Sequence, residues 1–188
     1  MNATITKLVL AFCFAMAATT LQAQDKFFTK SGSIHFMSKG AIETIQADHH
    51  SVTCVLDSKT GAIQFAVLMK GFEFKKALMQ EHFNENYVES DKYPKATFSG
   101  QITNNSDVNY AKDGVYTVHV KGKLTLHGET KDVDADGKII VKDGKLLTSS
   151  DFSILMSDYN INIPRLVKEN MSNTVIVSVN CTLEPLKG

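Results

Sequence analysis

Apolar and polar residues alternate with a period of two along most of this chain, and this pattern restricts the fold more than any other feature. Successive side chains of a β-strand point to opposite sides of a sheet, so the alternation predicts strands with one apolar and one polar face. The clearest runs cover residues 34–36, 51–56, 63–69, 116–126, 152–156 and 175–183, and a further strand follows Pro94. About eight strands, separated by turns such as Lys142-Asp-Gly144, predict an all-β antiparallel sandwich or barrel.

One stretch departs from this alternation and is typical of a helix. Within residues 74–87, Phe74, Leu78 and either Met79 or His82 recur at helical spacing. Pro94 then stops the helix before the next strand begins. We therefore expect one short helix in an otherwise all-β domain.

The first 23 residues have the build of a secretory signal peptide. Lys7 gives a positive start, an apolar run covers Leu8–Ala18, and Ala23 offers a cleavage point. The run is shorter than the roughly 20 residues that a membrane-spanning helix needs. We expect residues 1–23 to be removed and residues 24–188 to form one domain that is periplasmic or secreted.

Charge and cysteine content narrow the possible partners. The 20 basic residues balance the 20 acidic ones, and no basic stripe with interleaved aromatic residues occurs, so we expect no nucleic acid partner. After the signal peptide two cysteines remain, Cys54 and Cys181, both on the apolar phase of their strands. An oxidising compartment permits a disulfide, but a buried thiol is equally natural there, and the sequence leaves both open.

The histidines and serines form no arrangement that predicts a metal site or a catalytic centre. His49 and His50 are adjacent, so they point to opposite faces of a strand, and the other histidines lack the ligand spacing of zinc sites. We interpret the histidines as solvated or turn residues. Glu81 and His82 diverge by about 100° on a helix, and no Gly-x-Ser-x-Gly elbow is present. We expect no metal, no cofactor and no enzymatic activity.

Two parts of the sequence carry a resemblance to a known family. One combines Glu81-His-Phe83, Asp91-Lys-Tyr-Pro94 and Ala96-Thr-Phe98, and the other combines Leu124-Thr-Leu-His-Gly128 with Thr130-Lys131. In order, spacing and intervening turns they resemble the YceI-like domain family. The resemblance implies a lipocalin-like antiparallel β-barrel of about eight strands, with the short helix near its mouth. It also implies binding of an isoprenoid or other long-chain lipid inside the barrel.

On this hypothesis, the inward apolar positions line a cavity for the lipid chain. A barrel of eight strands is just wide enough either to be filled by side chains or to hold one small ligand. A polar headgroup is expected at the mouth, near Lys92, Tyr93 or His127. The predicted ligand contacts are Ile34, Phe36, Phe65, Val67, Phe98, Leu124, Leu126, Phe152 and Ile154 on strands, with Phe74, Leu78 and Phe83 as a lid.

Three alternatives to a lipid carrier stay open. A solid barrel that binds through its loops would be a structural or stress-related module. An enzyme would act on a bound lipid through His82 or His127. An outer-membrane barrel would need an apolar exterior, which the many lysines on the polar phase disfavour. An exposed edge strand would also permit a homodimer.

Overall fold

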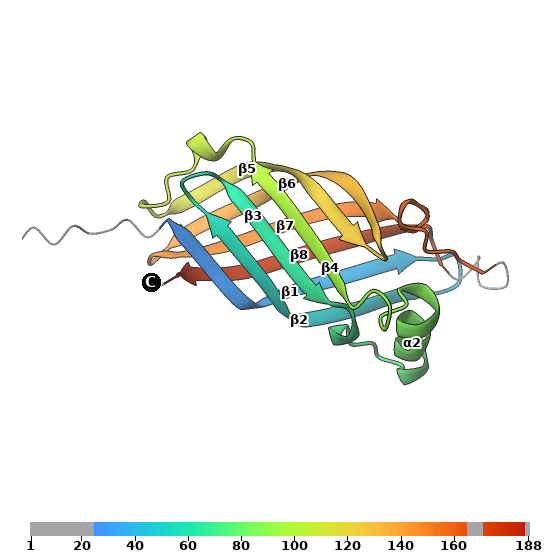
Figure 1. Cartoon of the computed structure of the whole chain (residues 1–188). Coiled ribbons are helices and arrows are strands. Elements are labelled where there is room, and N and C mark those ends of the chain that lie inside the picture. Colours follow the sequence, from blue (N-terminus) through green and yellow to red (C-terminus); the bar gives the residue numbers. More distant parts are fainter. Residues whose placement is uncertain (1–24, 165–170, 187–188) are drawn as a thin grey trace, which may run out of the picture.

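The computed structural model describes residues 25–164 and 171–186, in which eight strands close into an antiparallel barrel (Figure 1). The strands are β1 (Lys26–Lys39), β2 (Thr44–Asp57), β3 (Ala62–Leu68), β4 (Lys95–Ile102), β5 (Gly114–Leu126), β6 (Glu129–Lys142), β7 (Lys145–Leu155) and β8 (Thr174–Pro185). Each strand pairs with its sequence neighbours, and β8 closes the barrel on β1. The predicted fold class is confirmed, whereas the predicted signal peptide lies outside the described residues.

Strand β6 is the element that the alternation did not single out. Its outward face is acidic at every second position from Asp132 to Asp136, and its inward face carries small residues such as Ala135, so the apolar phase is weak. Its register is instead fixed across the ladder, where Lys121 Nζ on β5 lies 2.7 Å from Asp134 Oδ2. This charge pairing involves residues of two strands, so the alternation within either strand alone does not reveal it.

One end of the barrel is solid. The loop from β4 to β5, which includes the turn η3 (Asn105–Asp107), contributes buried residues to this end. In that loop the Tyr110 ring stacks on Phe27, with ring centroids 6.3 Å apart. Burial raises the pKa of Tyr110 to about 12, and its hydroxyl donates to Asn105 Oδ1 at 2.7 Å. The packed cluster below includes the fully buried leucines Leu56, Leu146 and Leu183.

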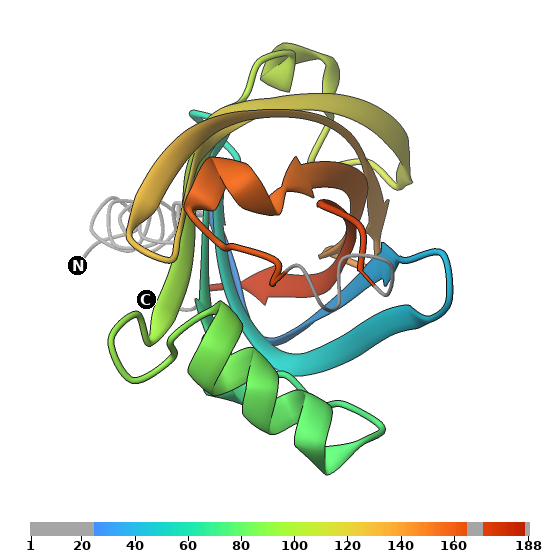
Figure 2. The same cartoon turned by 90° about the vertical axis from the view of Figure 1, so that its right-hand side faces the viewer.

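The connection from β3 to β4 lies at the opposite end and holds the helix (Figure 2). It contains η1 (Met69–Gly71), α2 (Ala77–His82) and the wide turn η2 (Phe83–Tyr87). The predicted helix is confirmed from Ala77 onward, but Phe74 precedes it in a segment that bridges to β2 through Glu73 and Asp48. Lys76 Nζ also binds Glu43 Oε1 at 2.7 Å. No helix within the described ranges is long and apolar enough to cross a membrane.

The predicted tight turn at His127-Gly128 joins β5 to β6 at the same end. Both residues have positive φ, 52° and 79°, as a type I′ hairpin turn requires. A Cβ atom added at Gly128 would also lie 2.7 Å from the Tyr93 ring, so this position has room only for glycine. The turn therefore fixes how the hairpin meets the loop that precedes β4.

Candidate functional site

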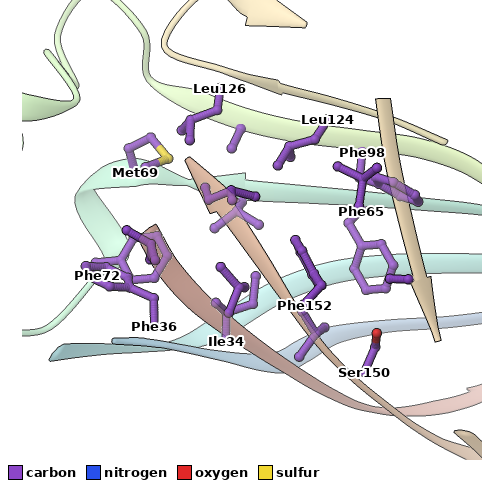
Figure 3. A pocket seen from close by; sticks show the side chains of 18 of the residues that line it. Ile34, Phe36, Phe65, Met69, Phe72, Phe98, Leu124, Leu126, Ser150 and Phe152 are labelled. Atoms are coloured by element: carbon purple, nitrogen blue, oxygen red, sulfur yellow. The ribbon is translucent and has the colours of Figure 1, made fainter. Parts of the chain in front are cut away.

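A cavity of about 340 Å³ lies inside the barrel, between the solid end and the helix (Figure 3). All eight strands contribute lining residues, and nearly all of the lining is apolar. The volume falls within the range of roughly 300–1,000 Å³ that is usual for small-molecule sites. Because an apolar cavity gives water few hydrogen-bond partners, it suits an apolar ligand better than ordered water.

Eleven of the twelve residues predicted to contact a ligand line this cavity. The alternation identified the inward-facing strand residues correctly. In a closed barrel every inward-facing side chain borders the same interior. Their contact with a lipid stays a prediction. The eleven are Ile34, Phe36, Phe65, Val67, Phe74, Phe83, Phe98, Leu124, Leu126, Phe152 and Ile154.

Leu78 is the exception among the predicted residues. Its side chain is 61% exposed, whereas Met79 and His82 line the cavity. The reason is that Phe74 is not part of the helix. Helical spacing counted from Phe74 therefore assigned the wrong face of α2 to the interior.

Four phenylalanines attach the helical connection to the barrel. The ring centroid of Phe36 on β1 lies 5.3 Å from that of Phe72 and 5.8 Å from that of Phe74. Phe83 in η2 lies 5.0–5.6 Å from each of these three rings. Aromatic pairs at such distances each contribute about 0.5–1.5 kcal/mol beyond their buried area. The contacts that hold the helix in place thus also form one wall of the cavity.

His127 links three segments at the helix end. Its Nδ1 donates to the main-chain oxygen of Tyr159, at 2.9 Å, in the turn η4 (Met156–Tyr159). Its Nε2 donates to the Glu89 carboxylate, at 2.8 Å. Because both partners are acceptors, the imidazole serves both when each ring nitrogen carries a hydrogen. Both nitrogens are therefore engaged in holding loops together.

The residues expected near a headgroup come together but do not line the cavity. Lys92 Nζ lies 4.8 Å from the centroid of the Tyr93 ring, which packs edge-on against His127 at 4.6 Å. The lining residues with polar or charged groups at the helix end instead include Ser38, Glu43, His82 and Tyr87. The hydroxyl of Ser38 donates to the main-chain oxygen of Ser172 at 3.0 Å.

The fold and the cavity can now be set beside known proteins. The model of the YceI-like domain family matches residues 14–183 of the chain. The chain belongs to this family. No curated protein sequence matches it.

Solved structures of other proteins share the YceI-like barrel. A polyisoprenoid binding domain from Saccharophagus degradans superposes with a TM-score of 0.75 at 14% identity, covering 86% of this chain and 99% of that one. BcnA from Burkholderia cenocepacia gives 0.66 at 15%, covering 81% and 95%. The YceI protein of Campylobacter jejuni gives 0.54 at 18%, covering 73% and 81%. At these identities the likeness establishes a common fold.

Two glycines make room for Phe98 inside this YceI-like barrel. Gly100 on β4 and Gly122 on β5 face each other in the ladder. A Cβ atom added at Gly100 would lie 2.6 Å from the Phe98 ring, and one at Gly122 would lie 2.5 Å from it. The ring therefore covers both glycines, and a side chain at either position would clash with the ring and with the neighbouring backbone, which lies 2.6–2.8 Å from the added Cβ atoms.

Sequence reasoning missed part of the lining. Val133, Ala135 and Gly137 line the cavity from β6, the strand that was not predicted. Phe72 lies in a segment that is neither a predicted strand nor the predicted helix. For β6, its acidic outer face opposite Lys121 was a usable signal, since cross-strand charge pairs are typical of a water-facing sheet surface.

His49 corrects the interpretation of the histidines as solvated or turn residues. It is 2% exposed, and its Nε2 donates to the main-chain oxygen of Leu68 at 3.0 Å. Its Nδ1 accepts the Ser51 N–H at 3.0 Å, so a neutral imidazole is fully satisfied. Among the described residues, no group of three or more histidine, cysteine, aspartate or glutamate side chains could hold a metal ion.

Cys54 and Cys181 are free, buried thiols at the solid end. The hydrogen bond with Cys181, together with burial, raises the pKa of the Cys54 thiol above its ordinary value. The Cys54 thiol, protonated and buried, is therefore a poor nucleophile, whereas its hydrogen bond to Cys181 lowers the pKa of that thiol. Of the two possibilities that the sequence left open, the structure has the reduced pair.

Proposed function

We propose that this YceI-like protein binds an isoprenoid or other long-chain apolar lipid inside its barrel, and that it sequesters or carries that lipid. The observation that carries the proposal is the cavity of about 340 Å³ with its apolar lining from all eight strands. The shared fold with a polyisoprenoid binding domain supports the choice of ligand class.

Burial of the chain supplies the binding energy. Each CH₂ group of a lipid that leaves water gains about 0.8 kcal/mol, so ten such groups gain about 8 kcal/mol before the loss of ligand freedom. Side chains such as Phe65 and Phe152, which border the cavity, also gain contacts when it is filled. Both contributions favour binding without any specific polar contact.

The proposed location is the periplasm or the cell exterior. Its support is the signal-peptide pattern of residues 1–23. The outward face of the barrel argues against the outer-membrane alternative, because Lys121 and Lys123 pair there with Asp134 and Asp132. Lysines facing the middle of a bilayer cost about 2–4 kcal/mol each, so this face is suited to water.

Two further alternatives are weaker. A structural module that binds only through loops has no need of an apolar cavity. An enzyme would use His82 or His127, but both ring nitrogens of His127 already hold loops together, and the His82 side chain makes no hydrogen bond within the described residues. We therefore propose a binding protein without catalysis. The homodimer stays a prediction that light scattering on the purified protein would test.

Lipid extraction tests the proposed function. The protein is purified without detergent and extracted with organic solvent, and the extract is analysed by mass spectrometry. Val177 lies between Phe36 and Phe152 in the ladders and lines the cavity, so Val177→Trp fills the binding space. Val115 is 64% exposed, so Val115→Trp is the matched control.

We expect a prenyl lipid from the wild-type protein and from Val115→Trp, and at least tenfold less from Val177→Trp. A wild-type protein that yields no lipid and does not bind added prenyl quinone would show that the carrier hypothesis is wrong.

A further inference from the structure

The pairing of β6 with β7 stops halfway along the two strands. It runs from Lys142–Lys145 at the hairpin to Gly137–Ser150 in the middle of the wall. Beyond that rung, among the described residues, β6 pairs with β5 and β7 pairs with β8. We call this part the seam: residues 129–136 of β6 and 151–155 of β7. At about 3.3 Å per residue, the β7 side of the seam is about 16 Å long.

Side chains satisfy the groups at which the ladder ends. The Ser150 hydroxyl on β7 donates to the main-chain oxygen of Asp136 on β6 at 2.7 Å, so at the first position past the last rung a side-chain contact replaces the main-chain ladder. The Asp151 carboxylate accepts a hydrogen bond from the Ser178 hydroxyl on β8. Because side chains take up hydrogen bonds where the ladder ends, the end of the β6–β7 pairing is encoded in the sequence and is not a frayed ladder.

The cavity borders the seam from inside. Val133 and Ala135 line it from β6, and Phe152 and Ile154 line it from β7. At the apex of the seam stands Gly137, which has no side chain, and the β6 backbone there forms the cavity wall directly. The wall is thus thinnest at the last rung, next to the part where the β6–β7 pairing is missing.

The turn η4 covers the wide end of the seam. Figure 2 shows β6, in gold, arching away from β7, with η4 in orange beneath it. Asn160, just after η4, donates its Nδ2 hydrogen to Glu129 Oε1 at 2.8 Å. His127 donates to the main-chain oxygen of Tyr159, and the buried side chains of Met156 and Tyr159 pack below. At the seam, polar side-chain contacts and the turn η4 therefore close the wall that a β-ladder closes elsewhere in the barrel.

We propose that the apolar chain enters and leaves the barrel sideways through the seam, with η4 as its movable cover. This inference rests on the proposed function. Opening the seam breaks the Asn160–Glu129 and His127–Tyr159 contacts but no rung of the barrel. Passage beside α2 would instead have to disturb the packed rings of Phe36, Phe72, Phe74 and Phe83.

Cross-linking the cover to β6 tests the route. Glu129→Cys and Asn160→Cys are joined by a cleavable bis-maleimide, while the buried native cysteines stay unlabelled. The control joins Lys142→Cys to Lys145→Cys, which links the same two strands at their paired end. The probe is a farnesyl chain with an anilino fluorophore, loaded before cross-linking and released into excess phosphatidylcholine vesicles.

We expect the seam cross-link to slow release at least tenfold, cleavage of the linker to restore it, and the control to stay within twofold of the wild type. The double variant Glu129→Ala/Asn160→Ala, which needs no cross-link, should release the probe faster. Unchanged release in both the cross-linked and the double variant overturns the lateral route and leaves the carrier function standing. A wild-type protein that binds no probe overturns the proposed function and the route with it.

Discussion

The two ends of this barrel are built from the same alternating strands but have opposite interiors. At the solid end, Leu56, Leu146 and Leu183 have no exposed surface and fill the space between the walls. Toward the helix, rings such as Phe152 and small residues such as Ala135 line a cavity. From this comparison we expect the solid end to carry most of the stability and the hollow end to carry the proposed binding.

The largest effect on stability is expected from Leu146→Ala at the solid end. Removing a fully buried leucine leaves a void, which typically lowers the free energy of unfolding by about 2–5 kcal/mol. Urea denaturation measures the change. Leu147, the outward neighbour, is 39% exposed, so Leu147→Ala should cost less than about 1 kcal/mol. Equal losses in the two variants would contradict a solid end that carries the stability.

The second largest effect is expected from Gly122→Ala, which should change both stability and lipid binding. The new Cβ atom would lie 2.5 Å from the Phe98 ring and 2.6 Å from Gly100 Cα and Ser99 O, so the ring and the β4 backbone must both shift, at an overpacking cost of about 1–3 kcal/mol. Retained lipid, measured by mass spectrometry, should fall severalfold. Adding Phe98→Leu to Gly122→Ala removes the contact with the ring but leaves those with Gly100 Cα and Ser99 O, so it should recover retained lipid and only part of the stability. Failure of the second change to recover any lipid would mean that the ring is not what fills this space.

A smaller effect is expected from Phe83→Ala at the helix end. The ring of Phe83 holds η2 against three other phenylalanines but is only partly buried, so its loss should cost about 1–2 kcal/mol. Amide hydrogen exchange should become faster in residues 77–87 and stay unchanged in β7. Leu78→Ala on the exposed face of α2 is the control, with no change in exchange. Faster exchange throughout the barrel would show that the helix end is not energetically separate.

The smallest effect is expected at the native cysteines. Because Cys54 and Cys181 are buried thiols, a maleimide should label neither in the folded protein and both after unfolding in urea. The mass of the unlabelled protein should match two free thiols. A mass two hydrogens lower, with no labelling after unfolding, would instead reveal a disulfide between them.

The sequence predicted the barrel well because strand phase is a local property. Each strand of a closed barrel has one inward face, so the alternation around Phe65 or Phe152 determined which side chains border the interior. The helical face was not predictable in the same way. Its phase depends on where the helix begins, and the bridge of Glu73 to β2 places that start after Phe74.

The empty space itself could not be predicted from the sequence. A cavity depends on side-chain volumes added across neighbouring strands, as where Phe98 lies over Gly100 and Gly122. The burial of His49 could not be predicted for the same reason, because the folded structure is needed to show that Leu68 and Ser51 are its hydrogen-bond partners. Strand β6 was not predicted either, because its acidic outer face indicates a strand only once its ion pairs with the lysines on β5 are known.

The most direct test of lipid binding inside the hollow end is native mass spectrometry of the delipidated protein titrated with a prenyl quinone. We predict one quinone per barrel for the wild-type protein and for Val115→Trp, and none for Val177→Trp. A wild-type spectrum without the adduct, or equal adducts in Val177→Trp, would contradict a lipid site in the cavity.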